Sequence, residues 1–311
     1  MPHRARRRIV CILLVLAMLA SFCMLPAGAE APQENTDAPV LLLMGDSIPD
    51  AFGIRNRDEA CYGRIIADTD HFIYRNIGIT ATDSRELIDL IDLYALWDRE
   101  KGGWRNVTDY IAEADIICLS IGGNDFFDRE DTAKLLVGAL FGVNRKTLDA
   151  IAAQYYENLC GIIDRIDTIN PDAVVIVQTL YSVWYGLGAI ANRACSKRVN
   201  AMIEKYDREH PGRIRICDIA PAMHGKPRNL ADDCVHPNAQ GNVAIARILL
   251  QKLYDLGLGS ETEPVVNVPG EDWNYFTEVC EKRSQVLALT ALVMIATGNG
   301  VNVFRLLKEI R

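Results

Sequence analysis

A serine, a histidine and an aspartate in this sequence have the chemistry of an acyl-transfer site. Ser47 ends the tripeptide Gly45-Asp46-Ser47 after an apolar run, and Asp233 precedes His236 by three positions. A serine hydroxyl is a weak nucleophile that needs a base within hydrogen-bond reach. A histidine base in turn needs a carboxylate that fixes its tautomer and stabilises the imidazolium. We therefore expect Ser47 as nucleophile, His236 as base and Asp233 as the residue that orients it.

Two further positions have the chemistry to stabilise an oxyanion. Gly78 follows the apolar run 72–77, and Asn124 lies in the segment 122–125, directly after the run 116–121. A tetrahedral intermediate needs hydrogen-bond donors aimed at its oxygen. An asparagine amide is such a donor, and so is the backbone N–H of a glycine, where no side chain blocks the approach. Each segment alone is also typical of an ordinary turn, so the prediction depends on their lying together.

Short apolar runs alternate with amphipathic stretches along the chain. The runs are almost continuously apolar, as are strands buried on both faces: Val40–Met44, Phe72–Ile77, Ile116–Ile121, Ala173–Gln178 and Ile214–Cys217. The helical stretches are Ser84–Leu96, Thr147–Ile169, Asn192–Glu209 and Gln240–Leu256. This order predicts a three-layer α/β fold, a parallel sheet with helices on both faces. Such a sheet binds ligands at the carboxyl ends of its strands, which is where the polar segments fall.

The set of segments resembles the SGNH hydrolases, also called GDSL lipases or esterases. The matching blocks are Gly45–Ser47, Gly78, Gly122–Asp125 and Asp233–His236, and the resemblance spans roughly residues 39–257. It implies a flavodoxin-like sheet and ester hydrolysis without a metal or other cofactor. It also implies a Ser-His-Asp triad, and an oxyanion hole made by the backbone N–H groups of Ser47 and Gly78 with the side chain of Asn124.

The sequence departs from the family's usual blocks at two positions. Ile48 is followed by Pro49, which fixes the backbone beside the nucleophile, whereas the family often has leucine or a threonine in this part of the block. Cys234 stands inside the Asp233–His236 block, where the family often has a small or apolar residue. We expect the proline to alter the wall of the pocket without removing activity.

Other residues near these blocks have more than one interpretation. Gly186–Ala191 fits a loose dinucleotide-binding fingerprint, but it does not follow the first strand, so we predict a loop there. His224 is either a surface residue or a rival base. The aromatic side chains after the fourth strand either form the wall of an acyl or sugar pocket or only fill space: Tyr181, Trp184 and Tyr185.

The first 29 residues have the pattern of an export signal. Four arginines between positions 4 and 8 precede an apolar stretch from Ile9 to Leu25, and Ala27-Gly28-Ala29 fits a cleavage site. The alternative is an uncleaved membrane anchor, because the apolar stretch is long for a signal. We predict a secreted or extracytoplasmic protein.

Seven of the nine cysteines follow the predicted signal. None has the spacing of a zinc site. Cys118 and Cys217 lie inside apolar runs and are predicted to be buried small hydrophobic residues. Export permits disulfides, and the pair expected near the site is Cys195 with Cys234.

The end of the chain is predicted to lie outside the hydrolase domain. Residues 258–270 are rich in Ser, Pro, Gly and acidic residues and indicate a linker, and 271–311 indicate a C-terminal helical extension. The extension holds an uncharged stretch, Ser284–Phe304, followed by basic residues. It is either a membrane anchor or a helix docked on the protein, and the glycines and asparagines within it weaken the first interpretation.

Composition limits the classes of partner that we expect for this protein. The formal charge is −8 and no large basic patch is visible, which excludes nucleic acid as an expected partner. The expected substrate is a small-molecule, lipid or acylated-sugar ester, and membrane association depends on the C-terminal segment. Three functions compete: a lipase-like esterase, a carbohydrate O-acetyl esterase, and a non-catalytic cell-surface binding protein. The complete Ser-His-Asp set favours an enzyme.

Overall fold

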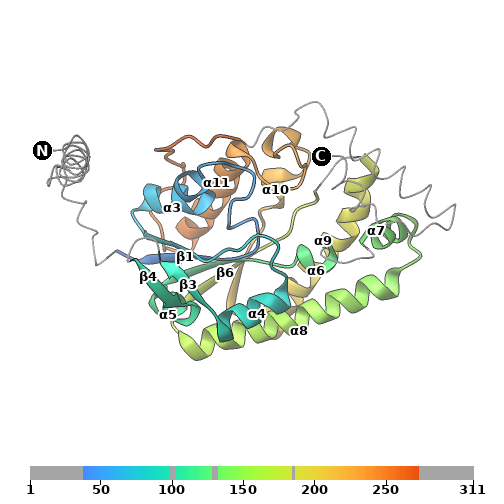
Figure 1. The fold of residues 1–311 in the computed structure, drawn as a ribbon, viewed down its shortest axis with the longest axis horizontal. Helices are drawn as coiled ribbons and strands as arrows, with labels where there is room; N and C mark the ends of the chain where they lie inside the picture. The colour runs from blue at the N-terminus through green and yellow to red at the C-terminus, as the bar shows by residue number, and fades with distance from the viewer. Residues whose placement is uncertain (1–37, 99–101, 128–131, 184–185, 273–311) are drawn as a thin grey trace, which may run out of the picture. The chain divides into compact units, whose positions relative to one another are not determined.

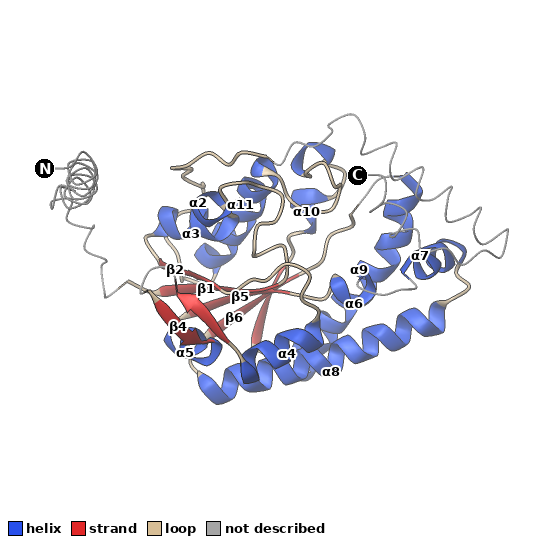
Figure 2. Cartoon of the chain, in the orientation of Figure 1, coloured by secondary structure: helices blue, strands red, loops and turns tan. Residues whose placement is uncertain are grey.

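The computed structural model describes residues 38–98, 102–127, 132–183 and 186–272. Its main sheet has five parallel strands in the order β2-β1-β5-β6-β7 (Figure 2). The strands are β1 (Val40–Gly45), β2 (Ile73–Asn76), β5 (Ile116–Ser120), β6 (Val174–Gln178) and β7 (Ile214–Cys217). Each predicted run coincides with one strand to within one residue at either end. The α/β prediction is confirmed.

Helices cover both faces of this sheet (Figure 1). One face carries α4 (Ser84–Leu93), α5 (Val107–Glu113), α8 (Arg145–Ile169) and α9 (Gly186–Glu209). The other carries α3 (Tyr62–Asp70), α10 (Ala220–Met223) and α11 (Ala239–Asp255). The other helices of the described residues are α2 (Arg57–Ala60), α6 (Asn124–Phe127), α7 (Thr132–Phe141) and the 3-10 helix η1 (Pro227–Asn229).

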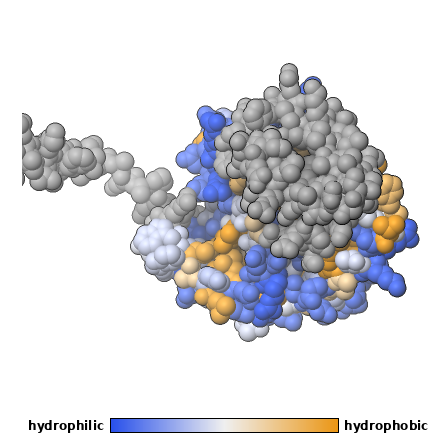
Figure 3. Space-filling view, turned by 45° about the vertical axis from the view of Figure 1, so that its right-hand side comes forward, coloured by the Kyte–Doolittle hydropathy of each residue, from blue (hydrophilic) through white to orange (hydrophobic). Residues whose placement is uncertain are grey.

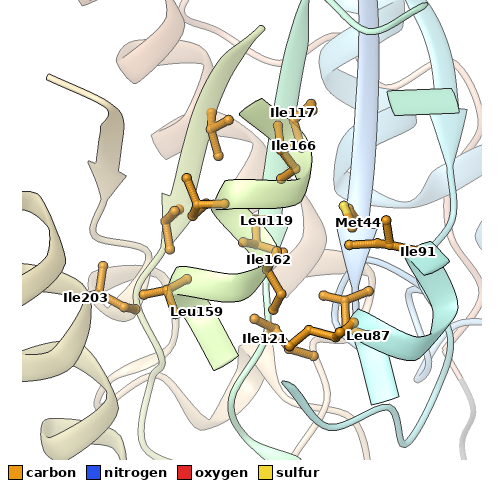
Figure 4. Close-up of a cluster of buried hydrophobic side chains, with 14 of the residues drawn as sticks. Met44, Leu87, Ile91, Ile117, Leu119, Ile121, Leu159, Ile162, Ile166 and Ile203 are labelled. Carbon is orange, nitrogen blue, oxygen red and sulfur yellow. The ribbon is translucent and has the colours of Figure 1, made fainter. Parts of the chain in front are cut away.

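The central strands are apolar on both sides because both sides are buried. Successive side chains of a strand point to opposite faces. Leu42 and Met44 of β1 therefore enter the core under α4 and α8, part of which Figure 4 shows, whereas Leu41 and Leu43 enter the core under α3 and α11. All four are fully buried. Burial of each such side chain stabilises the fold by about 1.5–3 kcal/mol.

Helix α4 begins where the sequence predicts and ends earlier. The side chain of Asp83 accepts a hydrogen bond from the N–H of Glu86, and the Glu86 carboxylate accepts one from the N–H of Asp83, which closes a capping box. The helix stops at Leu93, so the predicted extension to Leu96 is wrong.

The chain after α4 turns into an antiparallel hairpin. Strand β3 (Ala95–Asp98) pairs with β4 (Gly103–Asn106), and Trp97 stands opposite Trp104. Their rings meet edge to face, with centroids 5.8 Å apart. Cross-strand aromatic pairs of this kind stabilise two-stranded ribbons, and this pairing outweighs the helical periodicity that continued to position 96.

Helix α9 begins at Gly186, so the loop predicted for Gly186–Ala191 is wrong. Two glycines in a helical turn cost roughly 1 kcal/mol each relative to alanine. Tertiary contacts offset that cost, because α9 packs along α8 and α7. In addition, the buried Asn192 side chain accepts a hydrogen bond from the N–H of Val183, which ties the start of the helix to the loop after β6.

The segment after α11 runs along the domain as far as it is described. The N–H groups of Ser260 and Glu261 donate to the Asp70 carboxylate at the end of α3, and the N–H of Val265 donates to Thr69. The stretch 258–270, which the sequence indicates as a linker, thus contacts the α/β domain along its length.

The surface of the described chain mixes polar and apolar residues. In Figure 3 hydrophobic residues form separate patches between hydrophilic ones. Across the described ranges, no helix has both the length and the apolarity of a membrane span. The predicted signal 1–29 and the stretch Ser284–Phe304 lie outside those ranges.

Candidate active site

The predicted nucleophile stands on a tight turn at the carboxyl end of β1. Gly45 has φ 136°, and a Cβ there would lie 1.9 Å from the backbone oxygen of Ser120 on the neighbouring strand. Only glycine lets the two strands approach this closely. The turn is then fixed by the N–H of Ile48, which donates to the Asp46 carboxylate at 3.0 Å, and by the N–H of Phe52, which donates to the Ser47 carbonyl.

The loop before α11 brings a histidine and a carboxylate to this serine. The Nε2 atom of His236 lies 2.7 Å from Ser47 Oγ, and its Nδ1 atom lies 2.5 Å from Asp233 Oδ2. With the ring proton on Nδ1, the aspartate accepts it and Nε2 is free to accept the serine proton. The three side chains therefore form one chain of hydrogen bonds, in the order that general-base activation of a serine requires.

Asp233 is held as a carboxylate. Burial raises its pKa, but the hydrogen bond and charge of His236, together with the backbone N–H groups of Val235 and His236, outweigh burial and keep the pKa below its ordinary value. An ionised Asp233 stabilises the imidazolium that forms when the base takes a proton. On its other side, the histidine ring meets the ring of Phe52 edge to face, with centroids 4.8 Å apart.

The histidine loop is also held by its own backbone. The N–H of Ala231 donates to the carbonyl of His236, and Cys234 adopts the left-handed conformation at φ 61°. Cys234 is disulfide-bonded, whereas Cys195 is free, so the predicted pairing of these two is wrong. Cys195 instead lies in the hydrophobic core. The prediction of free, buried thiols at Cys118 and Cys217 is confirmed.

Gly78 lies against the turn that follows the serine. A Cβ at this position would lie 2.7 Å from the backbone nitrogen of Asp50 and 3.0 Å from Pro49, so the close approach requires glycine. Its N–H donates to Asn76 Oδ1 at 2.8 Å. An oxyanion bound at Gly78 therefore has to share this N–H with Asn76 or displace it.

Asn76 joins the end of β2 to the nucleophile turn. Besides accepting from Gly78, it donates to the carbonyl of Pro49 at 2.7 Å and to the hydroxyl of Tyr74 at 2.9 Å. Asn76 is not among the site residues predicted from the sequence. The signal available was an asparagine two positions before a glycine, a spacing at which an asparagine side chain hydrogen-bonds to the backbone.

Asn124 is the first residue of α6 and borders the same cavity as Ser47 and His236. One hydrogen of its amide donates to the carbonyl of Thr82 at 2.8 Å, which fixes the side chain. The amide carries a second hydrogen.

Two buried carboxyl groups near the site were not predicted. Burial raises the pKa of Asp46 to about 7 and that of Asp125 to about 6. Asp125 accepts hydrogen bonds from the backbone N–H and the hydroxyl of Ser84, and Asn158 donates to that same hydroxyl. This network ties the loop of Asn124 to the start of α4 and to the middle of α8, so it positions the polar end of the cavity.

A cavity of about 200 Å³ opens beside the serine and the histidine. Tyr181 forms part of its wall, and its hydroxyl donates to the carbonyl of Val235 at 2.9 Å. The other two aromatic residues proposed for the wall, Trp184 and Tyr185, lie outside the described residues.

His224, the alternative candidate for the base, is not among the residues that line this cavity. His224 caps the end of α10, and its ring contacts the guanidinium of Arg193 at 3.1 Å. Across the described ranges, no group of three His, Cys, Asp or Glu side chains is arranged to hold a metal ion.

The fold and this arrangement of serine, histidine and aspartate define the class of SGNH-type hydrolases. The model of the GDSL-like lipase/acylhydrolase family matches residues 43–244, and the chain belongs to that family. Membership supports ester hydrolysis as the class of reaction. A search of curated proteins finds no match.

Solved structures share the fold at low sequence identity. A lipase from a goat rumen metagenome aligns with TM-score 0.53 and 17% identity, over 71% of this chain and 99% of its own. Phospholipase A1 of Streptomyces albidoflavus gives 0.50 and 16%, over 69% and 99% of the two chains. An extracellular lipase of Streptomyces rimosus gives 0.50 and 16%, over 68% and 98%. The alignments cover nearly the whole of each of these proteins.

Proposed function

We propose that this protein is a serine esterase that hydrolyses carboxylic esters through Ser47, His236 and Asp233. The observation that carries the proposal is the pair of short contacts at His236, 2.7 Å to the serine hydroxyl and 2.5 Å to the aspartate carboxylate. Three side chains from two distant segments meet in the order needed for proton transfer. A binding protein has no requirement for that order.

The reaction proceeds in two halves. His236 takes the hydroxyl proton as Ser47 Oγ attacks the ester carbonyl, and the carbonyl oxygen becomes an oxyanion. The histidine then protonates the leaving alcohol as the carbon–oxygen ester bond breaks, which leaves an acyl group on the serine. Water attacks this acyl-enzyme with the same base, and the acid product leaves as the serine regains its proton.

The oxyanion is stabilised by the N–H groups of Ser47 and Gly78 and by the amide of Asn124. The carbonyl of Thr82 holds the amide of Asn124 in place before substrate binds. Asn76, which also donates to the carbonyl of Pro49, holds the N–H of Gly78 and shares it with the oxyanion. Donors that are fixed in advance stabilise developing charge without reorganising during the reaction.

Two measurements on the purified full-length chain test the proposal. The Ser47→Ala variant is expected to lose at least 10³-fold in kcat on a p-nitrophenyl ester, and a fluorophosphonate probe is expected to label the wild type on Ser47 alone. Ser182→Ala serves as the matched control and keeps its activity. Turnover retained in Ser47→Ala refutes the mechanism, and a folded wild type that neither labels nor hydrolyses esters favours the binding-protein alternative.

We also propose that residues 1–29 direct export and are removed. The support is the order of basic, apolar and small residues in this segment. N-terminal sequencing of protein recovered from a secreting host is expected to begin at Glu30. Retention of Met1 in that material contradicts removal, and fractionation of the same cells shows whether the chain stays with the membrane.

A further inference from the structure

The inner wall of the cavity beside the serine is part of the hydrophobic core. Phe126 and Cys195 border the cavity, and both are only 2% exposed members of the core under α8 and α9. Leu180, also in the lining, packs against that same core. A chain that enters the cavity past Ser47 therefore meets packed apolar side chains.

Two polar residues of α9 that line the cavity are hydrogen-bonded within the protein. Asn192 accepts from the N–H of Val183 at 2.9 Å, and the hydroxyl of Ser196 donates to the carbonyl of Arg193 at 3.4 Å. Among the described residues that line the cavity, none is lysine or arginine. An anionic occupant finds no counter-charge there, so the lining suits an uncharged hydrocarbon group.

The size of the cavity sets the length of such a group. An apolar cavity of about 150 Å³ is known to hold benzene, which has six carbons. On that scale a cavity of about 200 Å³ holds roughly eight carbons. This is far more than the single methyl of an acetyl group and far less than a sixteen-carbon fatty acyl chain.

We propose that this cavity binds the acyl part of the ester and selects medium-length chains, from hexanoyl to octanoyl. The proposal rests on the ester hydrolysis proposed above and names its substrate class. Burial of one methylene favours binding by about fourfold. The value of kcat/KM is therefore expected to rise at least tenfold from acetyl to hexanoyl, to peak by octanoyl, and to fall beyond it.

The first test is a p-nitrophenyl ester series with acyl chains of 2, 4, 6, 8, 12 and 16 carbons, measured on the full chain below the critical micelle concentrations. A maximum at acetyl overturns the proposal and favours a small-acyl enzyme such as an O-acetyl esterase. A value that still rises at 16 carbons overturns it as well. If Ser47 labels and no ester of the series is cleaved, the acyl-length proposal fails while the nucleophile stands.

Variants in the wall supply the second test. Ser196→Leu adds volume inside the cavity and is expected to lower the octanoyl-to-butanoyl ratio of kcat/KM at least tenfold. The matched control is Lys197→Leu, which places the same side chain one residue along α9 at an exposed position outside the lining, and leaves that ratio unchanged. Val183→Ala removes volume from the wall and is expected to move the maximum to longer chains.

Val183→Ala only removes atoms, so it tests the size of the cavity even if Ser196→Leu folds poorly. Circular dichroism and the melting temperature establish folding for each. The proposal is overturned if a folded Ser196→Leu lowers all chain lengths equally, or if Val183→Ala leaves the profile where it was.

Discussion

Replacing Asp233 with asparagine removes the charge of the catalytic loop and keeps its shape. In the wild type, one carboxylate oxygen accepts from the N–H groups of Val235 and His236 at 2.9 and 3.0 Å, and the other accepts from the His236 ring. The asparagine carbonyl retains the two backbone contacts. Its NH₂ group then faces Nδ1, so that the ring accepts there and carries its proton on Nε2, where it can no longer take the proton of Ser47.

The expected loss is about 10³- to 10⁴-fold in kcat, because a triad with the wrong histidine tautomer loses about 10⁴-fold. We place the lower bound at 10³ because the Asp233 side chain is 37% exposed and water reaches it. The range corresponds to about 4–5.5 kcal/mol of transition-state stabilisation. The KM is expected to change little, since the aspartate does not border the cavity.

The assay measures kcat, KM and melting temperature for Asp233→Asn and Asp233→Ala side by side. Alanine removes the acceptor of two backbone N–H groups that are exposed to water, so it is expected to lower stability by about 0.5–1.5 kcal/mol in addition to activity. Asparagine is expected to lower activity alone. Asp233→Asn with more than a tenth of wild-type kcat refutes the tautomer argument, and equal melting temperatures for the two variants refute the loop argument.

Three further predictions concern residues around the nucleophile. Asp46→Asn removes a carboxyl group whose pKa is raised by burial to about 7. Between about pH 4 and pH 7 only the folded state keeps this proton, so the unfolding free energy of the wild type falls by up to about 4 kcal/mol as pH rises through that window. Denaturant titrations of the variant over the same pH range should show a fall that is smaller by this amount. Gly45→Ala places a Cβ against the backbone of Ser120, so the variant should be unfolded or should melt at a much lower temperature. A wild-type melting temperature would contradict the close approach of the two strands at this turn. Asn76→Ala removes the contacts that join the end of β2 to Pro49 and orient the N–H of Gly78, and it should lower kcat about 10- to 100-fold with little change in KM; an unchanged kcat would show that Asn76 does not position the Gly78 N–H for the oxyanion.

The sheet was predictable from the sequence because each of its strands is buried on both faces, so a short apolar run has one structural interpretation. The position of Ser47 followed from the same logic, since the carboxyl ends of parallel strands share one edge, whereas His236 reaches that edge from the loop before the last helix. The hairpin of Trp97 and Trp104 was not predictable in this way. Its stability comes from a pairing across two strands, and no local periodicity reports such a pairing.

The positioning contacts of the site were also beyond sequence reasoning. The type of Asn76 is visible in the sequence, but its simultaneous contacts with Pro49, Tyr74 and Gly78 depend on how two loops meet. Similarly, the two glycines at the start of α9 argue against a helix unless the packing of α7 and α8 is known. Local chemistry thus indicated the proposed reacting groups, and tertiary structure supplied the groups that hold them.

The two contacts of His236 differ greatly in the length of chain they close. The contact with Asp233 spans three residues, whereas the contact with Ser47 spans 189. During refolding, the short loop can form early, while the long-range contact forms only after the sheet that contains β1 is complete and the last helix has packed on it. The recovery of esterase activity is therefore expected to be slower than the recovery of the helical circular dichroism signal, so that enzyme turnover reports the last step of folding.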